Sequence, residues 1–442
     1  QTDFRCNERP RQRKCGDTNL NLEADMKQGW EIKKLGEICD FGNGLWKGKK
    51  PPFINVGVVR NTNFTKEGEL DDSDIVFLEV EQSQFAKRKL KYGDIILEKS
   101  GGGPKQPVGR VIVFNKKEGN YSFSNFTSVI RINSSKQVDF TYLHRFLFFS
   151  YISGVTERMQ SHSTGIRNLK FDEYKDIKVP LPPLSEQQRI VAILDEAFAS
   201  IVKAKANAEQ NLKNVKELFE SICNQELWQQ NKNCPQKKLA EIVDNNRGGV
   251  KIGPFGSALK IGELVDKGDV RVLYIENIVN NKFDWEKEKY ITNEKFDELR
   301  NYEVFSGDVL ITIMGTIGRT AIVPENLGKA IISSHLIKIT LNQKLISSEF
   351  LNYSLNSNPF VVLQLFGQAK GAIMKGINSS IIKNLIIPLP AIKEQSMIVK
   401  RLHALNEETK RLETIYRQKL NDLEELKKSL LTKAFNGKLK TA

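Results

Sequence analysis

Two long stretches of this chain repeat the same spacing of apolar and polar positions, and each predicts one long helix. Apolar residues recur at alternating steps of four and three, which places them on one face of a helix that packs along a partner helix. The stretches start at Ile190 and Ile398, an offset of 398 − 190 = 208. The predicted seam positions are Ile190, Leu194, Ala197, Ile201, Ala204, Ala208, Asn211, Val215, Leu218 and Ile222, and, at the same offset, Ile398, Leu402, Leu405, Thr409, Leu412, Tyr416, Lys419, Leu423, Leu426 and Leu430.

The two predicted helices are long enough to act as a spacer. A helix of about 40 residues is roughly 60 Å long at 1.5 Å per residue. The polar seam members Asn211, Thr409 and Lys419 weaken packing and can fix the register of the pair. The alternative is two unrelated amphipathic helices, each buried on its own domain. The shared offset favours two helices that pair with each other.

A proline-containing motif precedes each predicted helix. The first copy reads Pro180-Leu-Pro-Pro-Leu-Ser-Glu-Gln187, and the second reads Pro388-Leu-Pro-Ala-Ile-Lys-Glu-Gln395. Proline fixes φ and cannot continue a helix, so each copy predicts the end of a globular unit and the start of a helix.

The segments before the two motifs also match each other, which predicts two globular units with one α/β (α+β) architecture. Short β-rich runs bounded by Gly, Asn and Pro are followed by a helical stretch in each unit. The matched segments are 33–40 with 237–244, 90–97 with 304–311, 108–110 with 317–319, 129–132 with 336–339, and 140–150 with 347–356. The predicted organisation is a disordered extension (1–25), a first domain (26–184), a long helix (185–232), a second domain (233–392) and a second long helix (393–442).

Charge and cysteine content narrow the class of partner. The 442 residues contain 67 Lys and Arg against 53 Asp and Glu, a net charge of +14. A basic excess of this size fits a nucleic-acid partner, although many soluble proteins are also basic. No apolar run reaches the length of a membrane span. The five cysteines lack a CxxC pair, which disfavours a zinc site or disulfide framework and suits a reducing cytoplasm.

The sequence lacks the motifs expected of the relevant enzymes. The tetrapeptide that holds a flipped adenine in methyltransferases is absent, since Lys50-Pro-Pro-Phe53 lacks the leading amide or carboxylate. No Walker A motif occurs, and the four histidines show no metal-ligand spacing. Asp94 with Glu98 and Lys99 resembles a nuclease set, but the second copy does not keep the second carboxylate. Catalysis by this chain alone is therefore not expected, and no metal ligand is predicted.

Glycine-containing loops carry the candidate DNA contacts. Lys and Arg suit phosphates, whereas Arg and Asn also suit guanine and adenine edges. Any single Lys or Arg in such a loop can equally be solvated, so clustering is what favours DNA. The candidates are Trp46, Lys47, Lys49, Lys50, Lys99, Lys105, Arg110, Arg167 and Asn168 in the first unit, and Arg247, Lys251, Ser257, Lys260, Arg319, Lys370 and Lys375 in the second.

The doubled proline motif and doubled helices resemble the specificity subunit of type I restriction–modification systems, over residues 27–442. The second copy departs from the pattern at Ala391 and Lys393. The resemblance implies two target-recognition domains, each reading one half of a bipartite double-stranded DNA target. It implies an antiparallel coiled coil between the long helices, with a pseudo-twofold arrangement of the domains.

The resemblance also implies partners for the chain. Two modification (methyltransferase) subunits would dock around the helices, and restriction subunits would join the full complex in a prokaryotic cytoplasm. S-adenosylmethionine, ATP and Mg²⁺ would belong to those partners and not to this chain. Two other functions are open: a fused methyltransferase or nuclease of the same lineage, and a coiled-coil adaptor without DNA specificity.

Overall fold

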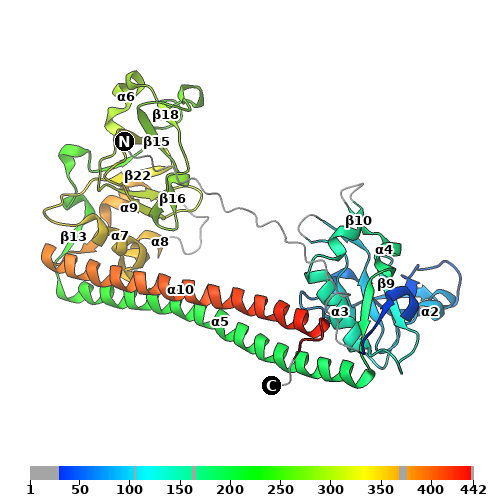
Figure 1. The fold of residues 1–442 in the computed structure, drawn as a ribbon. Coiled ribbons are helices and arrows are strands. Elements are labelled where there is room, and N and C mark those ends of the chain that lie inside the picture. The colour runs from blue at the N-terminus through cyan, green and yellow to red at the C-terminus, as the bar shows by residue number, and fades with distance from the viewer. Residues whose placement is uncertain (1–28, 104–105, 162–165, 368–375, 440–442) are drawn as a thin grey trace, which may run out of the picture. The chain divides into compact units, whose positions relative to one another are not determined.

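The computed structural model describes residues 29–103, 106–161, 166–367 and 376–439. The predicted extension 1–25 and the candidate residues Lys105, Lys370 and Lys375 lie outside these ranges. The described residues form two compact units (Figure 1): the first takes in 29–207 and 419–439, and the second takes in the described part of 208–418. Both long helices contribute residues to both units.

The first unit is built on a four-stranded antiparallel sheet of order β2-β9-β5-β7. A second sheet has the order β4-β3-β8, and smaller pairings join β10-β11-β6 and β1-β12. Its strands are β1 (Glu31–Lys34), β2 (Cys39–Asn43), β3 (Phe53–Val59), β4 (Val76–Glu81), β5 (Ile95–Glu98), β6 (Ser100–Gly102), β7 (Val111–Val113), β8 (Tyr121–Phe123), β9 (Thr127–Ile132), β10 (Gln160–Ser161), β11 (Arg167–Leu169) and β12 (Lys178–Leu181). Its helices are α1 (Leu35–Ile38), α2 (Gln82–Arg88), α3 (Phe140–Ile152), α4 (Phe171–Lys175) and the first part of α5 (Leu184–Asn233).

The second unit repeats this plan with the sheet order β14-β22-β19-β20 and a second sheet β18-β15-β21. Its strands are β13 (Gln236–Lys238), β14 (Val250–Ile252), β15 (Val270–Leu273), β16 (Ile278–Val279), β17 (Lys282–Phe283), β18 (Tyr290–Ile291), β19 (Val309–Thr312), β20 (Thr320–Ile322), β21 (Ala330–Ile332), β22 (Leu336–Ile339) and β23 (Ile386–Pro388). Its helices are α6 (Asn293–Leu299), α7 (Ser348–Ser357), α8 (Pro359–Phe366), α9 (Ser379–Asn384) and the first part of α10 (Ile392–Phe435).

The strand registers show how the two units correspond. Ile130 of β9 lies opposite Phe41 and Ile95, and Ile339 of β22 lies opposite Val250 and Val309. Ile130 is therefore the counterpart of Ile339, an offset of 339 − 130 = 209. The sequence match of 129–132 with 336–339 is wrong by two residues. A shift of two keeps every side chain of a strand on the same face, so an apolar pattern cannot detect it.

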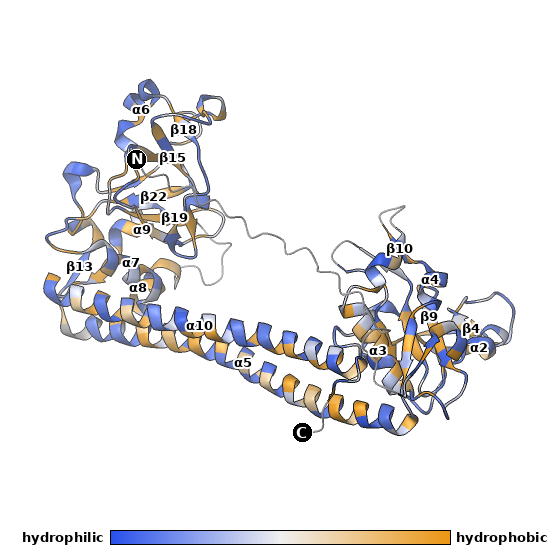
Figure 2. Cartoon of the chain, in the orientation of Figure 1, coloured by the Kyte–Doolittle hydropathy of each residue, from blue (hydrophilic) through white to orange (hydrophobic). Residues whose placement is uncertain are grey.

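In each unit the beginning of one long helix packs against the end of the other. In the first unit Leu194 of α5 belongs to the same buried cluster as Leu431 and Phe435 of α10. In the second unit Leu227 of α5 shares a cluster with Leu402 of α10. The helices are therefore antiparallel in both units. Figure 2 shows the apolar residues of α10 as separate bands on a mostly hydrophilic helix, as expected for a helix with a narrow buried stripe.

In the second half of each long helix, the buried residues no longer coincide with the predicted heptad positions. Leu218 is 59% exposed and Leu426 is 47% exposed, so the seam prediction is wrong at both. Cys223 and Leu431, which directly follow the seam positions Ile222 and Leu430, are fully buried, at the offset 431 − 223 = 208. A straight helix has 3.6 residues per turn and drifts about 20° per heptad from a 3.5-residue repeat, which moves the stripe by one residue.

The remaining seam candidates fall into three groups. The buried ones are Ile190, Leu194, Ile201, Ala208, Ile398 and Leu402. The half-buried ones are Ala197, Ala204, Val215, Ile222, Leu405, Leu412, Tyr416, Leu423 and Leu430. The polar positions Asn211 and Lys419 are exposed, whereas Thr409 is half-buried.

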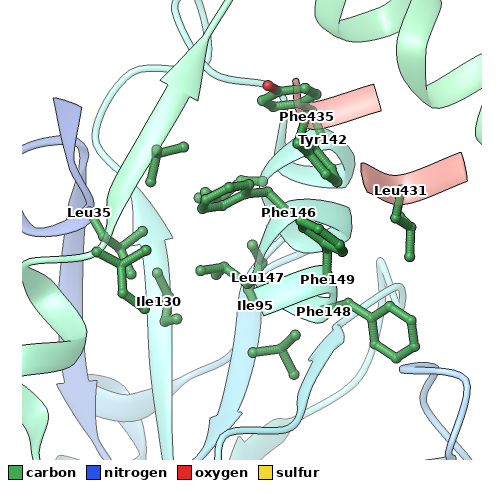
Figure 3. Close-up of a cluster of buried hydrophobic side chains, with 14 of the residues drawn as sticks. Leu35, Ile95, Ile130, Tyr142, Phe146, Leu147, Phe148, Phe149, Leu431 and Phe435 are labelled. Atoms are coloured by element: carbon green, nitrogen blue, oxygen red, sulfur yellow. The ribbon is translucent and has the colours of Figure 1, made fainter. Parts of the chain in front are cut away.

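Aromatic side chains from α3 surround the end of α10 in the first unit (Figure 3). The Phe435 ring centroid lies 5.5 Å from that of Tyr142, 5.2 Å from Phe146 and 5.6 Å from Phe149. Phe435 is fully buried. Asp139 caps α3 by accepting hydrogen bonds from two backbone N–H groups of its first turn. The C-terminal turn of α10 is therefore part of the first unit's core.

The glutamine of each proline motif explains why the motif recurs. Gln187 is completely buried, and its Nε2 donates to the carbonyls of Gln137 and Pro182 at 2.8 Å each. Its Oε1 accepts from the N–H of Asp139 at 2.9 Å. One side chain thus joins the start of a long helix to the proline segment and to the cap of α3.

Gln395 makes the same three bonds in the second unit. Its Nε2 donates to the carbonyls of Leu345 and Pro390 at 2.9 Å each, and its Oε1 accepts from the N–H of Ser347 at 3.0 Å. Ser347 caps α7 as Asp139 caps α3. A buried amide whose oxygen and both N–H groups are paired fixes one geometry, because any other leaves polar groups unpaired.

Candidate nucleic-acid interface

The loop after β2 presents Trp46 to solvent. The indole is 65% exposed, and Lys47, Lys49 and Lys50 beside it are exposed as well. Glu81 holds the loop, because its Oε2 accepts from the N–H groups of Lys49 and Lys50 at 3.2 Å each. Its own N–H donates to the carbonyl of Lys47 at 2.9 Å. Three cations and one aromatic ring are therefore displayed on an anchored loop.

A hollow of about 420 Å³ brings together Lys99 and Asn168, which are far apart in the sequence. Lys99 Nζ donates to Asn43 Oδ1 at 2.8 Å, and Asn125 also lines the hollow. Partial burial lowers the pKa of Lys99 from its ordinary value. Asn168 Oδ1 accepts from the hydroxyl of Ser100. Amide and ammonium groups at one point are suited to base edges and phosphates.

A neighbouring hollow of about 360 Å³ shares Asn43 and is strongly basic. Lys87, Arg88 and Lys89, at the end of α2, line it. This cluster was not predicted from the sequence, although the run Lys87-Arg88-Lys89 is a signal for it. Clustered cations in a concave surface raise the local positive potential that attracts phosphates.

Arg110 lies in the protein framework instead of a free loop. Its guanidinium forms hydrogen bonds of 2.7 and 3.0 Å with Glu98, whose side chain is 2% exposed. It also donates to the carbonyls of Phe64 and Asn61 at 3.0 and 3.1 Å. With these bonds made, Arg110 supports the loop beside β5, and its contact with DNA stays a prediction.

Arg167 is also turned toward the protein, with 15% of its side chain exposed and its guanidinium 3.6 Å from Glu157. The nuclease-like pair of Asp94 and Glu98 is engaged as well. Asp94 accepts from Nε of Arg131 at 2.7 Å and, like Glu98, is buried. Both carboxylates are committed to arginines, so they form scaffold ion pairs.

In the second unit, the candidates around β14 are spread over its two ends. The guanidinium of Arg247 lies over the Phe305 ring, 4.1 Å from the centroid, and remains exposed. Lys251 Nζ is 6.0 Å from the ring of Tyr302. Ser257 and Lys260 are exposed in the long loop after β14. This loop contains a second exposed aromatic, Phe255, which is not among the residues predicted from the sequence.

Arg319 is half-buried at the start of β20, and its N–H donates to Thr312 Oγ1 at 3.0 Å. The structure shows no hydrogen bond or ion pair from its guanidinium to the rest of the described chain. Its charge is therefore available to a partner.

The second unit contains a buried Asp–Lys pair next to the turn that carries Arg247. Asp308 Oδ2 is 4.0 Å from Lys338 Nζ, and each side chain is 2% exposed. Burial raises the pKa of Asp308 to about 6, and it lowers the pKa of Lys338. Lys338 also donates to the carbonyl of Arg247 at 3.3 Å. The pair anchors the turn that carries Arg247.

A cavity of about 570 Å³ lies between α7, the β16–β17 hairpin and the long helices of the second unit. Asn352 and Asn356 of α7 line it, together with His403 and Asn406 of α10. Tyr353 also lines it, and burial raises the pKa of this phenol to about 12.

The same place in the first unit is filled. At the offset of 208, Phe148 replaces Asn356 and Phe198 replaces Asn406, and both rings are buried. Lys427 Nζ lies 4.9 and 5.2 Å from the two ring centroids. The opening is therefore specific to the second unit's side chains and not a consequence of the shared fold.

Among the residues that the structure describes, no group of three or more His, Cys, Asp or Glu side chains could hold a metal ion. None of the helices within the described ranges combines the length and apolarity needed to cross a membrane.

Comparisons with known proteins agree on one family. The family model described as type I restriction modification DNA specificity domain matches residues 27–214 and 250–425. The chain is 26% identical over 318 residues to the type I restriction enzyme EcoBI specificity subunit of Escherichia coli, covering 67% of this chain and 66% of that one. It is 23% identical over 435 residues to the putative type I restriction enzyme MjaX specificity subunit of Methanocaldococcus jannaschii, covering 94% and 95%.

A solved structure shows the same fold. A chain from work on complex assembly and conformational transition of the type I R-M system superposes with a TM-score of 0.74 at 18% identity, covering 94% of this chain and 99% of that chain. The two-domain mixed α/β fold with long connecting helices is thus the one predicted. The family model matches most of the chain, once in each unit, and the chain therefore belongs to the family of type I restriction modification DNA specificity domain proteins.

Proposed function

We propose that this chain is the sequence-reading subunit of a type I restriction–modification complex, in which each unit reads one half of a bipartite double-stranded DNA target. The observation that carries the proposal is the repetition of one sheet plan, with cationic loops at its edge, in both units. Two readers in one chain match a target with two halves. Family membership and the named relatives support the same function.

We propose that the long helices space the readers and dock two modification subunits, with restriction subunits joining the full complex. Both helices contribute to both units, so they link the readers directly. The amide-lined cavity beside α10 offers hydrogen-bonding groups for a docked partner. We place this complex in the cytoplasm of a prokaryotic cell.

We also propose that the chain is not itself catalytic. S-adenosylmethionine, ATP and Mg²⁺ would be bound by the partner subunits. The sequence lacks the adenine-methyltransferase tetrapeptide and a Walker A motif, and Asp94 and Glu98 are bound to arginines. Isothermal titration of the full chain with S-adenosylmethionine should show no binding. Binding with a micromolar Kd would favour the fused methyltransferase instead.

A domain exchange tests the reading function. Residues 233–390 would be replaced by the matching segment of another specificity subunit, and the purified complex with its modification subunits would select DNA from a random library. We expect the selected sequence to change in one half and stay constant in the other. Selection of no sequence by the native complex, with a salt-dependent affinity alone, would favour the adaptor function.

A further inference from the structure

Both units display a large aromatic side chain at one equivalent position of the fold. Trp46 is 65% exposed and Phe255 is 69% exposed. Their offset is 255 − 46 = 209, the same as that of Ile130 and Ile339 in the sheet registers. Equivalent rings exposed in two units that share few side chains point to a common task.

The glycine two residues before each ring confirms the equivalence. A Cβ on Gly44 would lie 1.8 Å from the carbonyl oxygen of Ser124, and a Cβ on Gly253 would lie 2.0 Å from that of Ser333. Both serines directly follow the corresponding strands β8 and β21. No side chain fits there, so glycine lets the backbone pass close to the sheet and turn outward.

The residue between glycine and ring is held by the protein in both loops. Leu45 packs against the small cluster of Val56, Val80 and Phe85, and its N–H donates to the carbonyl of Phe123 at 2.8 Å. Its counterpart Pro254 is buried. The backbone that carries each ring is therefore held by the protein, and the ring points from this fixed segment into solvent.

The surroundings of each ring indicate a polyanion as partner. Lys47, Lys49 and Lys50 are exposed beside Trp46, and Lys260 is exposed in the loop of Phe255. Three cations accompany Trp46 and one lies in the loop of Phe255. An exposed apolar ring with cations nearby matches a nucleic-acid duplex, whose phosphates surround apolar base faces. An apolar protein surface would leave these ammonium groups without partners.

We propose that Trp46 and Phe255 are apolar wedges, each of which stacks on a base or opens a base step in the half-site read by its own unit. Apolar side chains of DNA-binding proteins insert between base steps and kink the duplex. The proposal rests on the function proposed above and adds the mode of contact. In this proposal, sequence specificity comes partly from how easily a given base step is deformed, as well as from hydrogen bonds with base edges.

The test uses the complex with its modification subunits, bound to target DNA that carries 2-aminopurine at successive positions of one half-site. Unstacking raises the fluorescence of this base. We expect Trp46→Ala to abolish the rise in one half-site and Phe255→Ala to abolish it in the other. Each should also weaken specific binding by roughly 5- to 150-fold, the range for losing one base–aromatic stack. Trp46→Phe should keep most of the signal.

Two other exposed apolar side chains, one aromatic and one aliphatic, serve as controls. Phe77, 54% exposed on β4, and Leu363, 66% exposed on α8, should tolerate alanine with fluorescence and affinity unchanged. If the native complex binds specifically and both ring variants keep the fluorescence rise and the affinity, the wedge proposal alone is overturned. Absence of specific binding by the native complex would overturn the proposed function and the wedge with it.

Discussion

Replacing Gln187 by alanine should destabilise the first unit far more than any surface change on the same helix. The native side chain is completely buried and pairs with three backbone groups, at 2.8, 2.8 and 2.9 Å. Alanine removes all three bonds at once. The N–H of Asp139 and the carbonyls of Gln137 and Pro182 then stay buried without their partner.

The expected cost follows from those three groups. An unsatisfied buried donor or acceptor costs about 1–3 kcal/mol, and water entering the space left by the amide recovers part of this. We expect a net loss of about 3–5 kcal/mol in the free energy of unfolding of the first unit. For a unit of this size, 3 kcal/mol corresponds to a fall in Tm of about 6–12 °C.

Scanning calorimetry and hydrogen exchange would measure the effect. The matched control is Gln188→Ala, which removes the exposed glutamine next along α5 and should change stability by less than about 0.5 kcal/mol. Gln395→Ala should produce the same loss in the second unit, seen as faster exchange in α7 instead of α3. A loss below about 1 kcal/mol for Gln187→Ala would refute the reasoning that this amide joins helix, proline motif and cap.

Three further changes test packing, burial and charge. Phe435→Ala should cost about 3–5 kcal/mol, measured by chemical denaturation, because it empties the space between three aromatic rings. Because burial raises the folded pKa of Asp308 to about 6, the folded state binds a proton that is lost as pH rises from about 4 to 6. Native stability should therefore fall by about 3 kcal/mol across that window relative to Asp308→Asn. A thermal-melt series in which these two proteins give parallel curves against pH would contradict this. Lys99→Gln should weaken DNA binding and reduce the slope of log K against log salt by about 1, and an unchanged slope would place Lys99 away from phosphates.

The sequence predicts the large-scale features because they rest on repeated or unusual residues. The 208-residue offset and the proline motif were enough to predict two units and two long helices. Alternation of apolar residues could not give the strand register, since Ile132 and Ile130 occupy the same face of β9. Heptad counting likewise failed at Leu218, because a small angular drift accumulates along 50 residues.

The candidate site was harder to predict because contacts join distant segments. Nothing near Lys99 in the sequence indicates that Asn43 and Asn168 meet it. Arg110 and Lys47 look alike in the sequence, yet only the structure shows that Arg110 is held by Glu98. The equivalence of Phe255 and Trp46 emerges only from the strand registers, whose offset of 209 differs by two residues from the sequence match of 129–132 with 336–339.

Methylation mapping tests the central claim most directly. Genomic DNA from cells that express this chain with its cognate modification subunit would be sequenced for methylated adenines. The account predicts a two-part motif with a fixed gap, modified on both strands, in every modified site. A single undivided motif, or methylation without any sequence preference, would contradict a chain that holds two readers.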